Sequence, residues 1–335
     1  MKNLTPVWLR RIAAIAAGIV LGVAVAVFAA QRAFSPLAPH AAPVDFVLAP
    51  GSSLAAAARE LEERRLIRSA RAFRWYAHWT GVDARLQAGE YELSPAMSVR
   101  EIVQRLTAGK VKSYSIALPE GLTATEIAAR LATQDLTEIN SFLAAVRDAE
   151  LARTLGFEGE TLEGYLFPET YQLQKGLSPH DLIEILVGEF RKAWEQVAPA
   201  AAAAGLSQRQ AVILASLIEK ETGIAEERAL ISSVFHNRLR RGMRLETDPS
   251  VIYGITDFDG DLRRTHLEDE RNLYNTYRIA GLPPGPIGNP GLASLRAAVL
   301  PAATEYFYFV SRNDGTHVFS KTYREHVNAV NRYQK

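Results

Sequence analysis

The chain has 335 residues, 48% of them hydrophobic, and a formal net charge of +1 at pH 7. This length is enough for one large domain or two smaller ones with hydrophobic cores, and the near-neutral charge argues against nucleic acid as a partner. Because the chain contains no cysteine, it has no structural disulfide, no thiolate metal site, no cysteine nucleophile and no lipid-modified N-terminal cysteine.

The first element is an apolar, uncharged run of about nineteen residues that begins at Ile12. At ~1.5 Å per residue, a helix of this length nearly matches a hydrocarbon core of ~30 Å. Lys2, Arg10 and Arg11 precede the run, so the positive-inside rule keeps residues 1–11 in the cytoplasm. A cleaved signal peptide is the alternative, but its apolar core is usually only ~7–15 residues long. We therefore predict an uncleaved, single-pass transmembrane helix over 12–31 and a proline-rich linker over 32–43.

Three stretches then repeat one pattern, in which a short strand ends at a proline turn and a capped helix follows. The strands begin near Phe46, Gly89 and Tyr114, and the predicted N-caps are Ser53, Ser98 and Thr123. Such β-α units resemble LysM-type modules, which bind glycans that contain N-acetylglucosamine, but the same pattern is also ordinary α+β architecture. We assign residues 44–112 to a LysM-like region and place another such unit at about 113–175.

The stretch 71–79 is rich in aromatic residues and reads RAFRWYAHW. It could form a platform on which sugars stack. Aromatic residues at helical spacing more often belong to a hydrophobic core, and we predict that role here.

The segment 206–223 predicts a buried helix with both ends marked. Ser207 is a suitable N-cap, Gln210 completes a capping box, and Gly223 stands where a left-handed residue ends many helices. The residues between them are apolar on nearly every side, which is typical of a helix surrounded by protein.

Glu219 lies on the same stripe of this helix as Val212, Ala215 and Ser216. A carboxyl group in apolar surroundings either finds a partner or keeps its proton, and a protonated carboxyl near neutral pH is what general-acid catalysis requires. A solvated surface glutamate is the alternative. Glu221 points to the opposite side of the helix, and periodicity does not decide which of the two is special.

The remaining elements follow from local signals. We predict a helix over 182–197, an alanine-rich link over 198–204, a helix over about 226–241 that ends at Gly242, and a short helix with Asp248 as N-cap. A short helix over 292–300, a hairpin around Asn313-Asp314-Gly315 and a last helix over about 323–333 complete the chain. The sequence contains no HExxH, GxSxG or P-loop motif, and we expect neither a metal nor a cofactor.

Five runs, in this order behind one N-terminal anchor, resemble the YceG-like family of endolytic murein transglycosylases. They are LEGYLFPETY, ASLIEKETG, VFHNRLRRGMRLETDPSVIYG, YNTY and GLPPGPIGNPG. The resemblance implies an α+β protein of the inner membrane, in which a transmembrane helix and LysM-like units precede a mixed α+β catalytic domain over 113–335. It also implies an enzyme outside the cytoplasm that cleaves nascent peptidoglycan strands internally.

The resemblance assigns the catalytic role to the first glutamate of the EKET run, which is Glu219. The other motif residues are implied to shape the glycan cleft; they are Glu163, Tyr165, Glu169, Tyr171, Thr247, Asp248, Asn275 and Thr276. The implied partners are peptidoglycan strands, the membrane and proteins of wall synthesis.

One carboxyl suffices for a lytic transglycosylase, because the 6-hydroxyl of the muramic acid replaces water as nucleophile. Two alternatives remain open. The chain could be a membrane-anchored glycan-binding scaffold without turnover, or a hydrolase in which a second carboxylate, Glu163, Glu169 or Asp248, assists Glu219.

Overall fold

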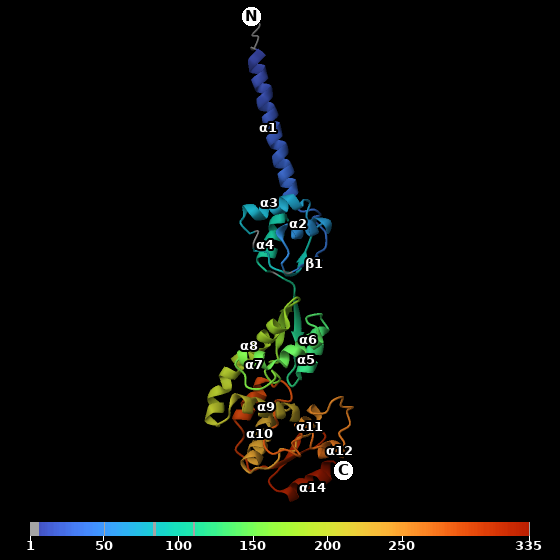
Figure 1. Cartoon of the computed structure of the whole chain (residues 1–335), viewed down its shortest axis with the longest axis vertical. Coiled ribbons are helices and arrows are strands. Elements are labelled where there is room, and N and C mark those ends of the chain that lie inside the picture. The colour runs from blue at the N-terminus through green and yellow to red at the C-terminus, as the bar shows by residue number, and fades with distance from the viewer. Residues whose placement is uncertain (1–6, 50, 83–84, 110, 335) are drawn as a thin grey trace. The chain divides into compact units, whose positions relative to one another are not determined.

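The computed structural model describes residues 7–49, 51–82, 85–109 and 111–334. The chain divides into two compact units, Met1–Ser113 and Tyr114–Lys335, and Figure 1 labels most of their helices. Residues 1–6, which belong to the predicted cytoplasmic segment, lie outside the described residues.

The first unit contains a long helix, two strands and three shorter helices. They are α1 (Val7–Phe34), β1 (Val44–Leu48), α2 (Leu54–Glu63), α3 (Ala70–Trp79), β2 (Gly89–Leu93) and α4 (Val99–Thr107). β1 and β2 pair antiparallel with Phe46 opposite Tyr91, and both of these rings are fully buried. Alternate residues of the two strands therefore form one wall of a core that α2, α3 and α4 complete.

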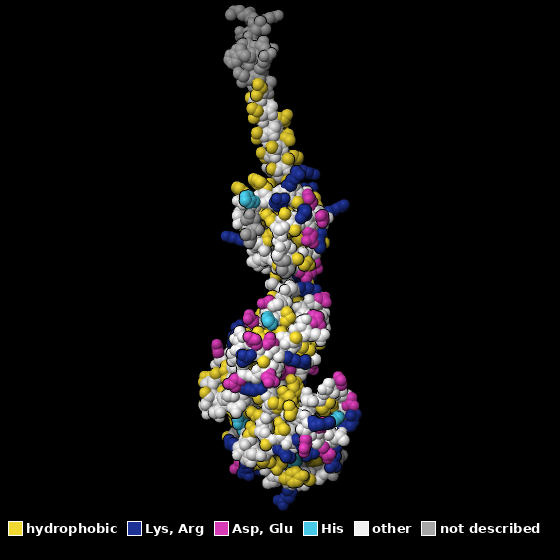
Figure 2. All heavy atoms as spheres, in the orientation of Figure 1, with side chains coloured by type: hydrophobic (Ala, Val, Ile, Leu, Met, Phe, Trp, Pro, Cys, Tyr) yellow, Lys and Arg dark blue, Asp and Glu magenta, His cyan; other side chains and the backbone are white. Residues whose placement is uncertain are grey.

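The α1 helix extends beyond the predicted transmembrane span at both ends. Its stretch Ile15–Phe34 has 20 residues and a mean hydropathy of 1.9, so it is long and apolar enough to cross a membrane. Figure 2 shows hydrophobic side chains along this helix, whereas charged side chains are spread over both units.

The second unit begins with β3 and continues to the last helix. Its elements are β3 (Ser113–Ala117), α5 (Ala124–Ala132), α6 (Ile139–Val146), α7 (Ala149–Thr154), β4 (Thr170–Gln174), α8 (Pro179–Ala203), α9 (Gln208–Glu221), α10 (Ala225–Arg240), α11 (Asp248–Tyr253), α12 (Arg264–Glu268), α13 (Leu292–Val299), β5 (Tyr308–Ser311), β6 (His317–Ser320) and α14 (Tyr323–Tyr333). β3 pairs with β4, and β5 pairs antiparallel with β6. The predicted α+β class is confirmed, and so are the C-terminal hairpin and last helix.

The α9 helix lies in the core of this unit. Every residue from Ala211 to Ile218 is buried, and the helix packs against α8, α10, α11 and α13. The predicted capping box is present, since Ser207 accepts the N–H of Gln210 while the Gln210 side chain accepts the N–H of Ser207. The buried helix expected from the apolar run is confirmed.

Three local predictions were wrong. Gly223 does not adopt the left-handed conformation; α9 ends at Thr222, whose backbone is extended, with φ −148° and ψ 138°. The alanine-rich stretch 198–204 is not a link, because α8 continues to Ala203 through Pro199. The N-cap of α11 is Thr247, one residue before the predicted Asp248.

The three repeated units fold as predicted into a strand, a turn and a capped helix. Ser53, Ser98 and Thr123 each accept a backbone N–H from the first turn of the helix that follows. At Ser98 and Thr123 a glutamate three residues later completes a capping box.

We predict that Ser98→Ala lowers the free energy of unfolding by about 1 kcal/mol, because it removes an N-cap acceptor from α4. The measurement is urea denaturation of the purified protein, followed by circular dichroism. Gln104→Ala, an exposed change in the same helix, is the control and should leave the midpoint nearly unchanged. Equal effects of the two substitutions would contradict the prediction.

Candidate active site around Glu219

Glu219 lies in the last turn of α9, and its side chain is only 6% exposed. Its Oε2 accepts the backbone N–H of Gly291 at 2.9 Å, and its Oε1 lies 3.4 Å from the Nη2 of Arg228. Of the two outcomes expected for a carboxyl in apolar surroundings, the structure shows the first, since Glu219 has found partners. Both partners are donors and therefore stabilise the carboxylate.

Arg228, in the first turns of α10, joins Glu219 to a second carboxylate. Its Nη2 lies 3.8 Å from Oε2 of Glu120, and its Nε donates to the hydroxyl of Ser294 at 3.2 Å. The Arg228 side chain is 11% exposed, whereas that of Glu120 is 46% exposed. Partial burial, and next the negative charge of Glu219, raise the pKa of Glu120, while Arg228 opposes this shift. One guanidinium thus serves two carboxylates.

Glu120 reaches this position on the loop between β3 and α5. Gly121 has a φ of +79°, and a Cβ on it would lie 3.4 Å from Cγ of Glu219. The Gly121 N–H donates to the carbonyl of Asn289 at 2.8 Å, and the Asn289 N–H donates to the carbonyl of Leu122 at 2.9 Å. These two bonds join the loop to the segment that also supplies Gly291.

The side chain of Asn289 connects the same loops to a third segment. Its Oδ1 accepts the N–H groups of Gly164 and Leu166, both at 2.8 Å. Its Nδ2 donates to the carbonyl of Leu122 at 2.9 Å and to Oε1 of Glu163 at 2.8 Å. Because Asn289 is 1% exposed, these bonds form away from water and hold the surrounding loops firmly.

Glu163 is 4% exposed and accepts several hydrogen bonds. Besides Asn289, its donors are the N–H of Ala124 at 3.0 Å and the hydroxyl of Tyr253 at 3.2 Å. Burial nevertheless raises the pKa of Glu163 to about 7. The structure therefore places this predicted cleft residue inside the loop network.

Glu221, the second acidic residue of the EKET run, is partly buried beside the loop that follows α10. Burial, together with the charge of Asp248, raises the pKa of Glu221 to about 7. Glu221 thus has the raised pKa expected of a general acid, whereas Glu219 has hydrogen-bond partners that can hold a catalytic carboxylate in place. The structure leaves two candidates on one helix.

A cavity of about 940 Å³ adjoins this region in the second unit. Lys220, which follows Glu219, lines it, as do Glu163 and Tyr253. Thr123 and Ala124, just after the loop that carries Glu120, line it as well. The lining combines these polar side chains with apolar ones such as Ile252 and Phe258, and the size suits an extended ligand.

The other residues predicted from the loop 162–171 are mostly interior. Tyr165 is 1% exposed, and its ring lies 4.3 Å from that of Phe157 and 5.1 Å from that of Phe190, between centroids. Tyr171 is buried and donates its hydroxyl to the carbonyl of Phe167 at 2.6 Å. Glu169 is exposed.

The residues predicted from the two later motifs lie together. Thr276 is fully buried and accepts the N–H of Thr247 at 2.9 Å. Asn275 is also fully buried and donates to three backbone carbonyls in and after α12. Asp248 is exposed and accepts the hydroxyl of Tyr277 at 2.7 Å. This group anchors the loop beside Glu221.

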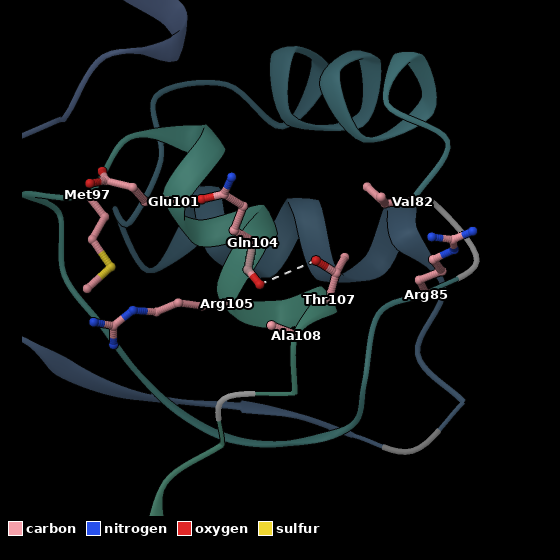
Figure 3. A pocket seen from close by; sticks show the side chains of 8 residues that line it. All are labelled: Val82, Arg85, Met97, Glu101, Gln104, Arg105, Thr107 and Ala108. Carbon is pink, nitrogen blue, oxygen red and sulfur yellow. Dashed lines mark hydrogen bonds between the residues drawn. The ribbon is translucent and has the colours of Figure 1, made fainter.

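The first unit has a cavity of its own along α4, with a volume of about 580 Å³. Figure 3 shows the residues that line it, with the backbone of Gln104 hydrogen-bonded to Thr107. Glu101, its one carboxylate among the described residues, is held in the capping box of Ser98, and none of the described lining side chains is aromatic. The cavity therefore offers neither a carboxylate pair nor a ring for stacking.

Residues 46–332 match the YceG-like family. The chain belongs to this family. An endolytic murein transglycosylase of Bacillus subtilis (strain 168) is 34% identical over 299 residues, which is 84% of this chain and 82% of that protein. The protein of the same name from Streptococcus pneumoniae serotype 2 is 26% identical over 291 residues, and there the match spans 78% of this chain but 53% of the relative. The crystal structure of a YceG-like protein from Listeria monocytogenes covers 86% of this chain, with 32% identity and a TM-score of 0.60.

Sequence reasoning on this YceG-like chain missed Glu120, Arg228, Asn289 and Gly291. Three of them stand in stretches that carried a signal, since Glu120 lies in a proline turn and both Asn289 and Gly291 lie in the run GLPPGPIGNPG. Arg228 carried none, because an arginine near the start of a helix is common at protein surfaces. In the part of the chain that the structure describes, no three histidine or acidic side chains are grouped so as to hold a metal ion.

The raised pKa of Glu163 predicts a pH dependence of stability. Its usual value is 4.5, and its value in the folded chain is about 7. Between these values the unfolded chain has lost the proton that the folded chain retains, so stability falls as the pH rises, by on the order of 3 kcal/mol. Glu163→Gln mimics the protonated acid and should reduce the loss of thermal stability between pH 5 and pH 8.

The measurement is the unfolding temperature at both pH values, by calorimetry. Glu184→Gln, an exposed change on α8, should keep the slope of the wild type. Since Glu221 contributes in the same direction, part of the slope remains in the Glu163 variant. If Glu163→Gln and wild type lose the same stability over this range, Glu163 is ionised in the folded chain and the prediction is wrong.

Proposed function

We propose that this protein is an endolytic peptidoglycan lytic transglycosylase that cleaves the β-1,4 bond between MurNAc and GlcNAc within glycan strands. Its relatives carry the name endolytic murein transglycosylase. The observation that carries the proposal is the buried carboxyl of Glu219, which Gly291 and Arg228 hold one residue before Lys220, a residue that lines the cavity of about 940 Å³. Cleavage leaves 1,6-anhydroMurNAc ends and limits the elongation of new strands.

Glu219 is proposed to act twice. As an acid, it first donates its proton to the glycosidic oxygen, and the bond from that oxygen to the anomeric carbon breaks. As a base, the resulting carboxylate then takes the proton of the 6-hydroxyl, whose oxygen bonds to the same carbon and closes the anhydro ring. Water takes no part, and the tethered hydroxyl has the high effective molarity of an intramolecular nucleophile.

The surroundings of Glu219 support both steps. The Gly291 N–H and Arg228 stabilise the carboxylate that serves as base. The negative charge of Glu120 beside Arg228 offsets part of the positive charge of the guanidinium, which favours the acid step. We assign Glu120 and Arg228 to positioning, because each acts through another group.

Eight residues are proposed to shape the glycan cleft, mainly by supporting its loops from the protein interior. Six of them are buried and fix loops through hydrogen bonds or ring contacts; they are Glu163, Tyr165, Tyr171, Thr247, Asn275 and Thr276. Glu169 and Asp248 are exposed and can meet sugar hydroxyls directly.

The proposed location is the inner membrane, with one span, a cytoplasmic N-terminus and the chain after the span in the periplasm. The apolar length of Ile15–Phe34 supports the span, and the basic residues before it support the orientation. Contact with proteins of wall synthesis and a LysM-like, glycan-binding role of the first unit belong to the same proposal. The capped β-α units of the first unit are consistent with that role.

The analysis of products separates this function from its two rivals. Purified protein is incubated with uncrosslinked glycan strands, and the new ends are weighed by mass spectrometry. Lytic cleavage gives anhydro ends, whereas a two-carboxylate hydrolase gives reducing ends one water heavier. A scaffold without turnover leaves the strands intact. Either of the latter two results would refute the proposed reaction.

Glu219→Gln should lower turnover by about 10²–10⁴-fold, the usual contribution of acid–base catalysis, because the amide neither donates nor accepts the required proton. Glu221→Gln, two residues away on the same helix, should retain most of the activity. Glu226→Gln, an exposed change on α10, controls for the loss of charge. The measurement is the rate at which anhydro ends appear. If Glu221→Gln lost more activity than Glu219→Gln, the general acid would be Glu221.

Glu120→Gln should lower turnover by roughly tenfold, which corresponds to ~1.4 kcal/mol in the barrier, because Arg228 then pairs with Glu219 alone. The pH profile of the rate should also change, because the variant removes a carboxyl with a raised pKa from beside Arg228, and the products should remain anhydro ends. Glu184→Gln on α8 serves as the exposed control. A loss as large as that of Glu219→Gln, with an unchanged pH optimum, would make Glu120 the second carboxylate of a hydrolase.

A further inference from the structure

The helix α3 lies at the C-terminal end of the membrane-spanning stretch of α1 (Figure 1). The ring of Phe34, the last residue of α1, lies 5.9 Å from that of Trp75 and 6.0 Å from that of Tyr76, between centroids. Arg68, just before α3, donates to the carbonyls of Pro36 and Leu37, both at 3.0 Å. These contacts, all within the first unit, fix α3 beside the end of α1.

The two faces of α3 differ sharply. Phe73 and Ala77 are fully buried in the core of the first unit, as the aromatic stretch predicted. Trp75 and Trp79 are not core residues, contrary to the prediction, because they are 59% and 72% exposed. Their rings are stacked, with centroids 5.8 Å apart and planes inclined by 6°. Two large rings left in water suggest a surface that meets a partner.

Basic side chains accompany these two rings. Arg71 and Arg74 are exposed on the same side of α3, and with Leu54, Trp75 and His78 they line a shallow cavity of about 400 Å³. Figure 2 shows Lys and Arg side chains next to hydrophobic ones where α1 enters the first unit. We define the α3 outer face as Arg71, Arg74, Trp75, His78 and Trp79.

The depth of this face relative to a membrane follows from α1. The uncharged apolar run that begins at Ile12 forms about 30 Å of helix, the thickness of a hydrocarbon core, and is followed by Gln31 and Arg32, so Phe34 lies about one helical turn beyond that core. The headgroup region on each side is roughly 5–7 Å thick. Phe34 therefore lies within this layer, and the ring of Trp75, 5.9 Å from that of Phe34 between centroids, lies beside it; tryptophan is enriched in this layer in membrane proteins.

From this geometry we propose that the α3 outer face docks on the lipid headgroups of the leaflet that α1 leaves. The rings of Trp75 and Trp79 lie at the level of the glycerol and upper acyl chains, and Arg71 and Arg74 pair with lipid phosphates. This inference rests on the proposed membrane anchor. It gives the first unit a fixed orientation on the membrane, which a single flexible tether would not provide.

Quenching of tryptophan fluorescence tests the docking. The full chain with Trp8→Phe and Trp194→Phe retains Trp75 and Trp79 as its emitting rings. It is reconstituted into vesicles of phosphatidylcholine and phosphatidylglycerol that carry bromine either near the top or near the end of the acyl chains. We expect a larger loss of emission with bromine near the top of the acyl chains than with bromine near their end. The emission maximum should also lie at a shorter wavelength than that of tryptophan exposed to buffer.

Charge variants test the phosphate contacts in the same vesicles. Arg71→Glu combined with Arg74→Glu should weaken the quenching, whereas Arg59→Glu, an exposed change on α2, should leave it unchanged. Emission typical of exposed tryptophan and unaffected by bromine at either position would overturn the docking.

Two further outcomes would also contradict the proposed docking. If soluble glycan fragments change the emission while bromine does not, the α3 outer face is a platform for sugars instead. If the protein does not float with the vesicles on a density gradient, the anchor itself is wrong. A protein that floats without quenching overturns only the docking, so the two failures are distinguishable.

Discussion

The side-chain amide of Asn289 holds together three segments that are far apart in the sequence. It accepts two N–H groups from the loop after Glu163 and donates to Leu122 and to Glu163 itself. With its backbone bonds to the loop that carries Glu120, this one buried residue sets the distance between the loops around the end of α9. An unsatisfied donor or acceptor there would be costly, so the geometry is strongly specified.

The charges near Glu219 depend on that geometry. Gly291, two residues after Asn289, presents its N–H to the carboxylate, and the loop joined to Asn289 brings Glu120 to the other side of Arg228. Because Arg228 lies between two carboxylates, it stabilises the negative charge of each one less than it would stabilise the charge of a single partner. Such a balance suits a group that has to be acid in one step and base in the next.

Glu163 and Glu221 show that a shifted pKa and a catalytic role are separate properties. Glu163 is buried and Glu221 is partly buried, and burial raises the pKa of each carboxyl to about 7. Glu163 is nevertheless fully engaged with backbone and side-chain donors in the loop network. Burial explains the shifts, and a raised pKa by itself does not make either group catalytic.

The sequence by itself determined the elements with strong local signals. The apolar run of α1, the capping boxes at Ser98, Thr123 and Ser207, and the hairpin around Asn313 were all predictable, because each depends on residues a few positions apart. The motifs also sufficed to identify the family. Helix ends were less predictable, as α8 and Gly223 show, because tertiary packing outweighs the preferences of single residues.

Only the tertiary structure decided which side chains meet. Glu120, Arg228 and Gly291 come from three segments of the chain, with more than a hundred residues between the first and the last. No periodicity links them to Glu219. Trp75 and Trp79 were predicted to be core residues and are exposed, because helical spacing shows that residues share a face but not whether that face is covered. Long-range contacts, which depend on how the whole chain packs, settle both questions.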